Sequence, residues 1–263
     1  MRTKGLELPM PSSHKKVSGA GSSRKLLTAL LCFTEERPTW TVADLAAELD
    51  LSVTSTYRYV ALLREVGLLD SASQNSYRVT DLVLSLARAC EAAQAPLAEI
   101  GLPIMARVRD EIDETVLIAR RGGDAAYCVD RVESRRPVRL QFDKGQAMSL
   151  HAGSMSRILL ASMSRSERAN HLAAILPTLP STRVTMLTDE ALDRTQAEGW
   201  TESFEEVDEG IWGCAAAITS HGTVVASIGT AAPIFRSDQT RRDRMIELIR
   251  GAAAEISELL DQY

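Results

Sequence analysis

The stretch TVADLAAELDLSVTSTYRYVALLREVGLL, residues 41–69, decides the fold of the first part of the chain. Its apolar residues recur at helical spacing and predict a helix over 42–49. Ser52 is a favourable N-cap for a second helix over 53–66, and Gly67 tolerates the left-handed conformation that ends such a helix. Two short helices joined by a tight connection are typical of a helix-turn-helix.

The flanking residues extend this motif to a winged helix-turn-helix over residues 22–79. The segment SRKLLTALLCFT (23–34) places leucines on one helical face, and Pro38 then stops that helix. The polar turn SASQNS (71–76) is flanked by Leu68-Leu69 and by Tyr77-Arg78-Val79, which predicts a short hairpin. Three short helices followed by a hairpin are typical of a DNA-binding head.

The outer surface of the helix over 53–66 carries short hydroxyls and one arginine near the helix start. Hydroxyl groups allow close approach to DNA, and Arg58 can bond guanine in a bidentate manner or bind a phosphate. The alternative for this helix alone is an ordinary surface helix with a hydroxyl-rich start, but the hairpin that follows favours DNA. The residues expected to contact DNA are Thr41, Ser52, Thr54, Ser55, Tyr57, Arg58 and Arg78.

The rest of the chain predicts a linker and a larger domain of the α+β class. A linker over 80–96, helical from 80 to 95 and stopping before Pro96, is expected to hold the head away from a domain over 97–263. Further helices are expected over 97–111, 154–163, 164–176, 188–199 and from about Asp238, and strands over 114–121, 125–132, 139–142, 213–220 and 223–232. This order predicts a mainly antiparallel sheet with helices packed on it.

Composition and charge are those of an ordinary globular protein with a basic head. Of the 263 residues, 45% are hydrophobic and 25% are charged. Residues 1–79 carry a net charge of +2 and residues 80–263 carry −7, which suits a DNA-binding head on an acidic body. A polar, flexible tail over 1–21 lacks the apolar core of a secretory signal, and we expect a cytoplasmic protein without membrane contact. The four cysteines are widely spaced, so reduced thiols and neither metal nor cofactor are expected.

Both parts of the chain resemble the IclR family of bacterial regulators. The family's head motif runs approximately GLSKSTVHRLLxTLxxxGLL, and LSVTSTYRYVALLREVGLL (51–69) is similar to it, with Val53 at the usual Lys and Thr56 at a usual apolar position. The resemblance covers roughly residues 22–262. The segments similar to the family's C-terminal domain are AYCVDRVES (126–134), SLHAGSMSRILLA (149–161), GWTESFEEVDEGIWGCAAAI (199–218) and VVASIGTAAPIFR (224–236).

This resemblance implies a GAF-like effector domain whose ligand lies in a cleft between the sheet and its covering loops. The residues implied at that cleft are Leu140, Ser154, Met155, Ser203, Gly213, Cys214, Gly229 and Ala231. The start of the helix over 154–163 can offer backbone N–H groups to a carboxylate. Gly229 and Ala231 stand where acid-binding members carry hydroxyls, which favours a bulkier, more aromatic acid. The alternative, that the glycines serve tight strand packing, is equally open.

The function implied is a repressor whose operator binding responds to a small organic acid. Homodimers formed through the heads and the helix over 80–95, and pairs of dimers joined through the effector domains, are the expected assembly. The rival is an enzyme with an appended helix-turn-helix, but no nucleophile, metal or phosphate motif supports it. Three further features are candidates for chemistry, but each has a plainer structural interpretation. We expect His151 to cap a turn, Cys214 to be a buried small side chain and the acidic run at 205–209 to form a solvated loop.

Overall fold

The computed structural model describes residues 19–73 and 75–262, and the contacts divide them into two compact units. We call the unit up to Ala93 the head and the unit from Gln94 onward the C-terminal domain. Residues 1–18 of the tail expected over 1–21 lie outside the described residues.

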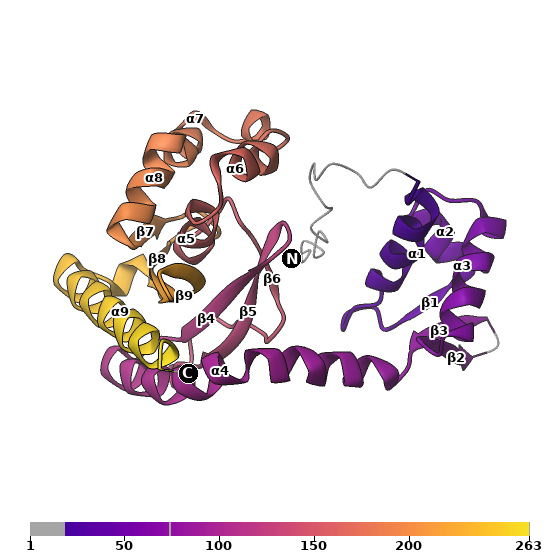
Figure 1. Cartoon of the computed structure of the whole chain (residues 1–263), viewed down its shortest axis with the longest axis horizontal. Coiled ribbons are helices and arrows are strands. Elements are labelled where there is room, and N and C mark those ends of the chain that lie inside the picture. The colour runs from indigo at the N-terminus through magenta and orange to yellow at the C-terminus, as the bar shows by residue number, and fades with distance from the viewer. Residues whose placement is uncertain (1–18, 74, 263) are drawn as a thin grey trace. The chain divides into compact units, whose positions relative to one another are not determined.

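The head is a winged helix-turn-helix, as the sequence predicts (Figure 1). Its three strands form an antiparallel sheet in the order β1-β3-β2. The helices are α1 (Gly21–Leu31), α2 (Val42–Glu48) and α3 (Val53–Glu65), and the strands are β1 (Thr39–Thr41), β2 (Leu69–Ser73) and β3 (Ser76–Val79).

Local capping explains where the two helices of the motif begin and end. The Thr41 hydroxyl accepts the amide N–H of Asp44 at the start of α2, and the Ser52 hydroxyl accepts that of Ser55 at the start of α3. Gly67 follows α3 with a φ of 79°, in the left-handed region. The predicted roles of Ser52 and Gly67 at the ends of α3 are confirmed.

Strand β1 was not expected, and its central residue explains why it forms. Trp40 is buried in the head core, pairs with Tyr77 of β3 and donates its indole N–H to the Cys32 carbonyl at 2.9 Å. The Arg37 guanidinium lies 3.3 Å from the centre of the Trp40 ring. Three residues are too few to show a periodic pattern, so the strand depends on tertiary contacts.

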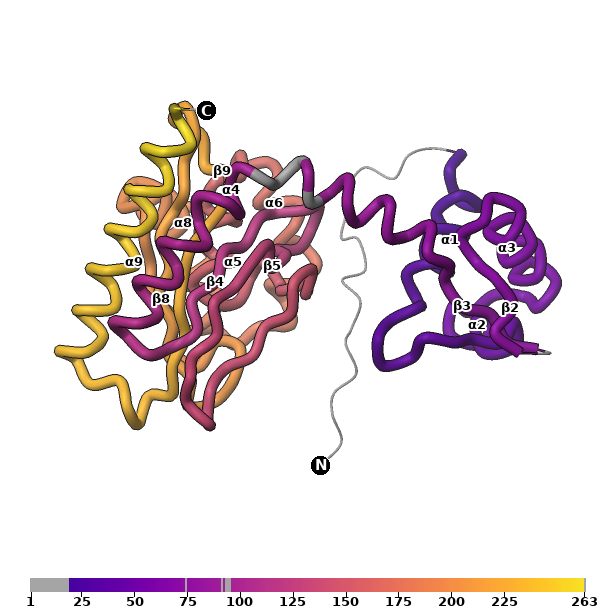
Figure 2. The backbone as a smooth tube through the Cα atoms, turned by 90° about the horizontal axis from the view of Figure 1, so that it is seen from below, coloured from indigo at the N-terminus to yellow at the C-terminus, as the bar shows by residue number. Residues whose placement is uncertain are grey.

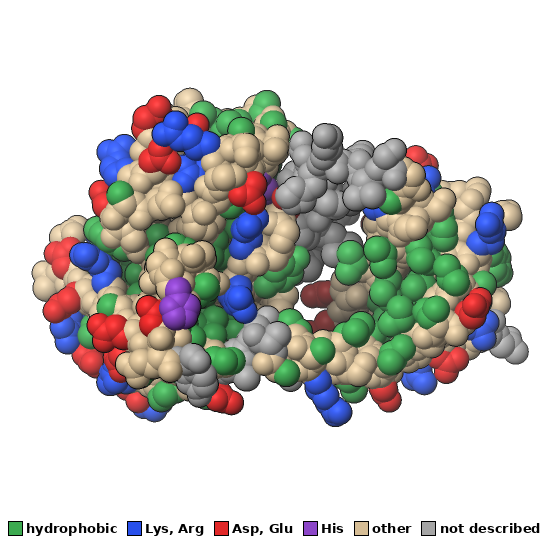
Figure 3. All heavy atoms as spheres, in the orientation of Figure 1, with side chains coloured by type: hydrophobic (Ala, Val, Ile, Leu, Met, Phe, Trp, Pro, Cys, Tyr) green, Lys and Arg blue, Asp and Glu red, His purple; other side chains and the backbone are tan. Residues whose placement is uncertain are grey.

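The leucines of α1 do not all face the core. Leu26 and Leu30 pack against it, whereas Leu27 and Leu31 remain 57% and 60% exposed. The start of α4 adds further exposed leucines to the head. Figure 3 shows hydrophobic side chains gathered on the face of the head that carries α1. We name the exposed leucines of these two helices the head leucines: Leu27, Leu31, Leu82, Leu84 and Leu86.

Helix α4 (Leu82–Ile112) is a single helix of 31 residues, so the expected stop before Pro96 is wrong. Pro96 and Pro103 both lie inside it. Each proline removes one backbone hydrogen bond and disfavours the helix. The second half of α4 nevertheless buries Leu97 and Met105 in the core of the C-terminal domain, and this burial offsets the cost of the prolines.

The C-terminal domain is built on six antiparallel strands in the order β6-β5-β4-β9-β8-β7. The strand expected over 139–142 is wrong, because these residues lie in a loop, and β6 and β7 were not expected. The strands are β4 (Val116–Gly122), β5 (Ala125–Val132), β6 (Ala147–Ser149), β7 (Trp200–Phe204), β8 (Ile211–Ser220) and β9 (Thr223–Pro233). The helices are α5 (Ser154–Ala161), α6 (Arg165–Leu172), η1 (Leu176–Thr178), α7 (Ser181–Val184), η2 (Thr185–Leu187), α8 (Asp189–Glu198), η3 (Ile234–Arg236) and α9 (Gln239–Leu260).

Helices cover both faces of this sheet (Figures 1 and 2). One face packs against α9 and the second half of α4 around Trp212 and Ile228. The other packs against α5 through Met155, Ile158 and Leu159. Because successive side chains of a strand point to opposite faces, every second residue of β8 and β9 faces α5. The α+β class, with a GAF-like, antiparallel sheet, is confirmed.

Candidate functional site

The surface of α3 presents the side chains that the sequence predicts. Thr56 and Val60 are fully buried on the inner side. Thr54, Tyr57 and Arg58 are exposed on the outer side, with Tyr57 at 56% exposure. Among the described residues no carboxylate forms an ion pair with Arg58. Its guanidinium therefore keeps all its donors available to an anion or a base edge.

The remaining predicted DNA contacts are arranged around this surface. The exposed Ser52 hydroxyl donates to that of Ser55 at 2.9 Å, so the two hydroxyls at the start of α3 share one hydrogen bond. Thr41 is half-buried, and its hydroxyl oxygen already accepts a hydrogen bond as the cap of α2. Its hydroxyl hydrogen is the group that it can donate to DNA. Arg78 is exposed in β3, opposite Asp70 of β2. Arg78 therefore belongs to the hairpin of β2 and β3, which is the wing, and not to α3.

A second candidate site lies at the start of α5 in the C-terminal domain. Gly153 precedes the helix with a φ of 84°, and every residue of the helix is buried. No side chain caps the helix, and no described residue accepts a hydrogen bond from the amides of Ser154, Met155 and Ser156. Buried amides without acceptors are rare in native structures. The start of α5 thus offers three donors and the positive end of a helix dipole to an anion.

Two hydroxyls and a glycine adjoin this helix start. Ser203 of β7 pairs with Gly213 of β8, which pairs with Ala231 of β9. A Cβ atom on Gly213 would lie 3.2 Å from the Ser203 hydroxyl and 3.3 Å from the Ser154 hydroxyl. The structure therefore brings together Ser154, Ser203, Gly213 and Ala231, as the resemblance implies.

Gly229 is needed for close packing. A Cβ atom there would lie 2.7 Å from the Cys214 carbonyl oxygen, 2.7 Å from Met155 Cγ and 3.0 Å from the Ala215 Cβ. The structure therefore supports tight packing as the reason for this glycine. Met155 lies against it from α5, so a ligand over Gly229 has to displace a flexible thioether side chain.

Two of the implied residues do not join this group. Cys214 points to the opposite face and packs in the core with Ile228 and α9, so its implied position in the cleft is wrong for its side chain. It is a buried small side chain, as its plainer interpretation holds, and burial raises the pKa of its thiol. Leu140 is half-buried in a loop, where its carbonyl accepts the Thr115 hydroxyl. The described contacts do not link its side chain to α5.

A buried ion pair that the sequence did not reveal supports the start of α5. Arg157 of α5 and Glu206 form it with side chains only 7% and 3% exposed. Arg157 also donates to the Thr201 hydroxyl and to the Glu202 carbonyl. The second carboxylate oxygen of Glu206 accepts the amide N–H of Gly153 at 3.0 Å. One ion pair thus joins α5, β7 and the loop that follows β7.

The expectation of a solvated acidic loop is therefore wrong for Glu206 and correct for its neighbours. Glu205, Asp208 and Glu209 are exposed, while Glu206 turns inward to Arg157. Consecutive acidic residues in sequence carry no sign of which one is buried. The single charged residue of α5, Arg157, directly before the apolar run at 158–161, is the one signal that could have revealed a buried partner.

The Nδ1 atom of His151 does not take part in the turn cap that the sequence analysis expects. That atom is buried and has no hydrogen-bond partner among the described residues. Burial lowers the pKa of the His151 imidazole, and the neighbouring His171 and Arg183 lower it further. Burial and these two neighbours thus favour the uncharged form of the His151 ring.

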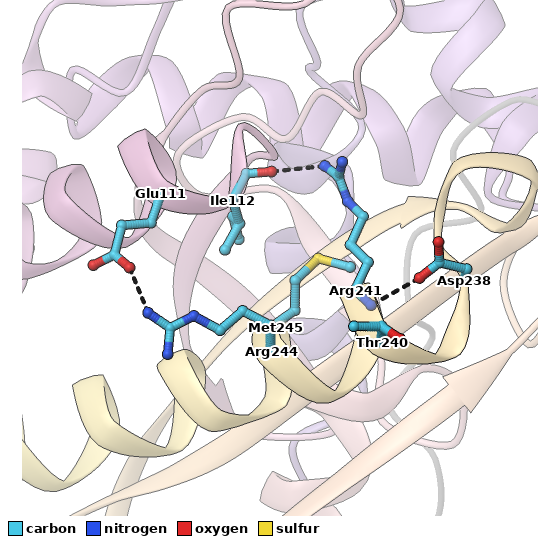
Figure 4. Close-up of a pocket in the computed structure, with 7 residues that line it drawn as sticks. All are labelled: Glu111, Ile112, Asp238, Thr240, Arg241, Arg244 and Met245. Atoms are coloured by element: carbon cyan, nitrogen blue, oxygen red, sulfur yellow. Dashed lines mark hydrogen bonds and ion pairs between the residues drawn. The ribbon is translucent and has the colours of Figure 1, made fainter.

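The C-terminal domain also has a surface pocket whose arginines bind other residues of the protein (Figure 4). It lies between the end of α4 and the start of α9. Arg241 donates to the Ile112 carbonyl at 2.7 Å, and Arg244 pairs with Glu111 at 2.9 Å. Because these guanidiniums already bind partners in the protein, the pocket joins two helices and offers little to a charged ligand.

A winged helix-turn-helix with an exposed arginine on its second motif helix, joined by one helix to an α+β domain, defines the class of helix-turn-helix transcriptional regulators. Two family models match the chain: the IclR helix-turn-helix domain over residues 22–72, and the bacterial transcriptional regulator IclR C-terminal domain over residues 91–258. The chain belongs to the IclR family of bacterial transcriptional regulators.

Curated relatives and solved structures agree with this assignment. The chain is 27% identical to the HTH-type transcriptional regulator KipR of Bacillus subtilis, over 87% of this chain and 93% of KipR. It is 28% identical to the HTH-type transcriptional repressor AllR of Escherichia coli K12, over 83% of this chain and 82% of AllR.

Two solved structures share the fold. An IclR transcriptional regulator from a Silicibacter species superposes with a TM-score of 0.78 at 20% identity, covering 92% of this chain and 96% of that one. An IclR homolog from Microbacterium hydrocarbonoxydans complexed with 4-hydroxybenzoate gives 0.73 at 23% identity, covering 92% of this chain and all of that one. None of the described helices is long and apolar enough to cross a membrane.

The Arg157–Glu206 ion pair predicts a large loss of stability when its carboxylate is removed. Glu206→Gln should lower the free energy of unfolding of the C-terminal domain by about 3–5 kcal/mol, because Arg157 is left buried and unpaired. The measurement is urea unfolding followed by tryptophan fluorescence. Glu209→Gln, in the same loop but exposed, is the matched control and should change stability by less than about 0.5 kcal/mol. Equal effects of the two substitutions would contradict this role for Glu206.

Proposed function

We propose that the protein is a cytoplasmic repressor whose binding to a DNA operator is modulated by a small organic acid bound at the start of α5. The observation that carries the proposal is the set of three buried amides without acceptors at Ser154, Met155 and Ser156. A carboxylate satisfies such donors and gains from the helix dipole. The hydroxyls of Ser154 and Ser203 lie beside them and can add hydrogen bonds.

An aromatic acid is the ligand class that these surroundings favour. Beyond the polar helix start, the residues of the sheet that face α5 are small or apolar, among them Ala215, Gly229 and Leu117. Met155 covers them and can change its rotamer more easily than a branched side chain. The structural relative from Microbacterium hydrocarbonoxydans binds 4-hydroxybenzoate, which supports the same class here.

The assembly we propose is a homodimer formed through the head leucines, with pairs of dimers joined through C-terminal domains. Five exposed leucines on two helices of one small domain are costly to leave in water. A second copy provides an apolar partner surface, and two heads together read a two-fold operator. Helix α4 connects each head to its C-terminal domain, so a change in one domain can reach the other through it.

The first prediction concerns DNA. Arg58→Ala should weaken binding to the preferred site by about 1–3 kcal/mol, because the exposed guanidinium contacts a base edge or a phosphate. The site is first obtained by selecting genomic fragments that the wild-type protein retains, and binding is then measured by mobility shift. Arg194→Ala, an exposed arginine of α8, is the control and should bind as the wild type does. Unchanged operator binding by folded Arg58→Ala would refute the role of α3.

The second prediction concerns the acid. Benzoate or 4-hydroxybenzoate should raise the melting temperature of the C-terminal domain more than acetate does. Ser154→Pro removes one amide donor at a position where a helix tolerates proline, whereas Ser154→Ala keeps that amide. We expect affinity to fall on the order of tenfold more in the proline variant than in the alanine variant. The site is misplaced if the two variants bind acids equally, or if no acid stabilises the wild type.

The third prediction concerns the dimer. Leu84→Asp places a charge among the head leucines, so the protein should sediment as a smaller species than the wild type at micromolar concentration. Leu102→Asp alters another exposed leucine of the same helix, 46% exposed against 55% for Leu84, that lies outside the head, and this variant should keep the dimer formed by the heads. A wild-type protein that sediments as a monomer would overturn the proposed assembly.

A further inference from the structure

Ser227 is a fully buried hydroxyl without a partner. Its side chain has 0% exposure, and its Oγ atom forms no hydrogen bond to any described residue. Serines in strands ordinarily bond to backbone or water, and a buried polar group left unsatisfied destabilises the folded state. The position therefore needs a reason other than stability.

The hydroxyl points toward α5, on the same face as the proposed ligand site. Ser227 pairs with Ala119 of β4 and Ala217 of β8, and its neighbours in sequence, Ala226 and Ile228, both pack on the opposite face against α9. Two residues farther along β9, on the same side as Ser227, lies Gly229. Because the residues beside Ser227 on both flanking strands are alanines, its hydroxyl is the polar group next to Gly229 in this row.

The proposed ligand site has a polar group at each of its two ends and apolar residues between them. Ser227 and Gly229 are two residues apart, which is about 6.6 Å along a strand. The start of α5 lies over the Gly229 end, where Met155 contacts the glycine. A flat ring that replaces Met155 above Gly229 would bring its carboxylate to the amides of α5 and its opposite edge toward Ser227.

We propose that Ser227 selects effectors that carry a hydrogen-bonding group at the end opposite their carboxylate, with hydroxyaromatic acids as the ligand class. This inference rests on the proposed acid-binding function of the α5 start. A ligand hydroxyl satisfies the Ser227 oxygen, which has no partner among the described residues. A ring without that hydroxyl leaves the oxygen unsatisfied and binds less tightly.

The test compares benzoate with 4-hydroxybenzoate by calorimetry on the full chain, in the wild type, Ser227→Ala and the control Ser149→Ala, an exposed serine of β6. The wild type and Ser149→Ala should bind 4-hydroxybenzoate about tenfold more tightly than benzoate. Ser227→Ala should bind the two acids with equal affinity. It should also melt no lower than the wild type, because it removes an unsatisfied buried group, and this shows that the variant folds.

The outcomes separate the two proposals. If both acids bind the wild type with equal affinity, or if Ser227→Ala keeps the wild-type preference, the role of Ser227 is refuted while acid binding stands. If neither acid binds the wild type, the acid-binding function fails and the selectivity proposal fails with it. A clear drop in the melting temperature of Ser227→Ala also counts against the proposal, because it shows a structural hydrogen bond at Ser227.

Discussion

The buried ion pair between Arg157 and Glu206 is the interaction on which the site in the C-terminal domain depends. Two charges removed from water lose several kcal/mol of hydration each, so such a pair persists only with further hydrogen bonds. Arg157 has these from Thr201 and Glu202, and Glu206 has one from Gly153. The pair therefore fixes the loop after β7 onto α5 and holds the helix start in place above the sheet.

Most helices and strands of the head could be predicted because they depend on residues close together in the sequence. Thr41, Ser52 and Gly67 act within a few residues of where they stand, and helical periodicity covers the rest. What was missed there depends on distant contacts. Trp40 forms a strand only because Tyr77 and Cys32 provide a partner and an acceptor. The same reasoning applies to α4, where Pro96 signals an end and only burial against the second domain keeps the helix intact.

The site in the C-terminal domain was predicted in outline and not in detail. Motif resemblance placed Ser154, Ser203 and Gly213 in one region, and the sheet register brings them together. It could not give the direction of a side chain on a strand, and a one-residue step in β8 turns Cys214 to the opposite face. It also could not tell which of several consecutive carboxylates is buried. Those features follow from three-dimensional packing, which local sequence does not encode.

The two faces of the central sheet differ in how well their polar groups are satisfied. On the face toward α9, Thr230 donates to the Thr115 carbonyl at 2.8 Å, and Trp212 donates to Glu202 at 2.9 Å. On the face toward α5, the Ser227 hydroxyl and the first amides of the helix have no partners among the described residues. Unsatisfied groups destabilise a fold unless a bound ligand provides the missing partners. The Ser227 hydroxyl and the first amides of α5 lie on the same side of the sheet, so one ligand between the sheet and α5 can satisfy both.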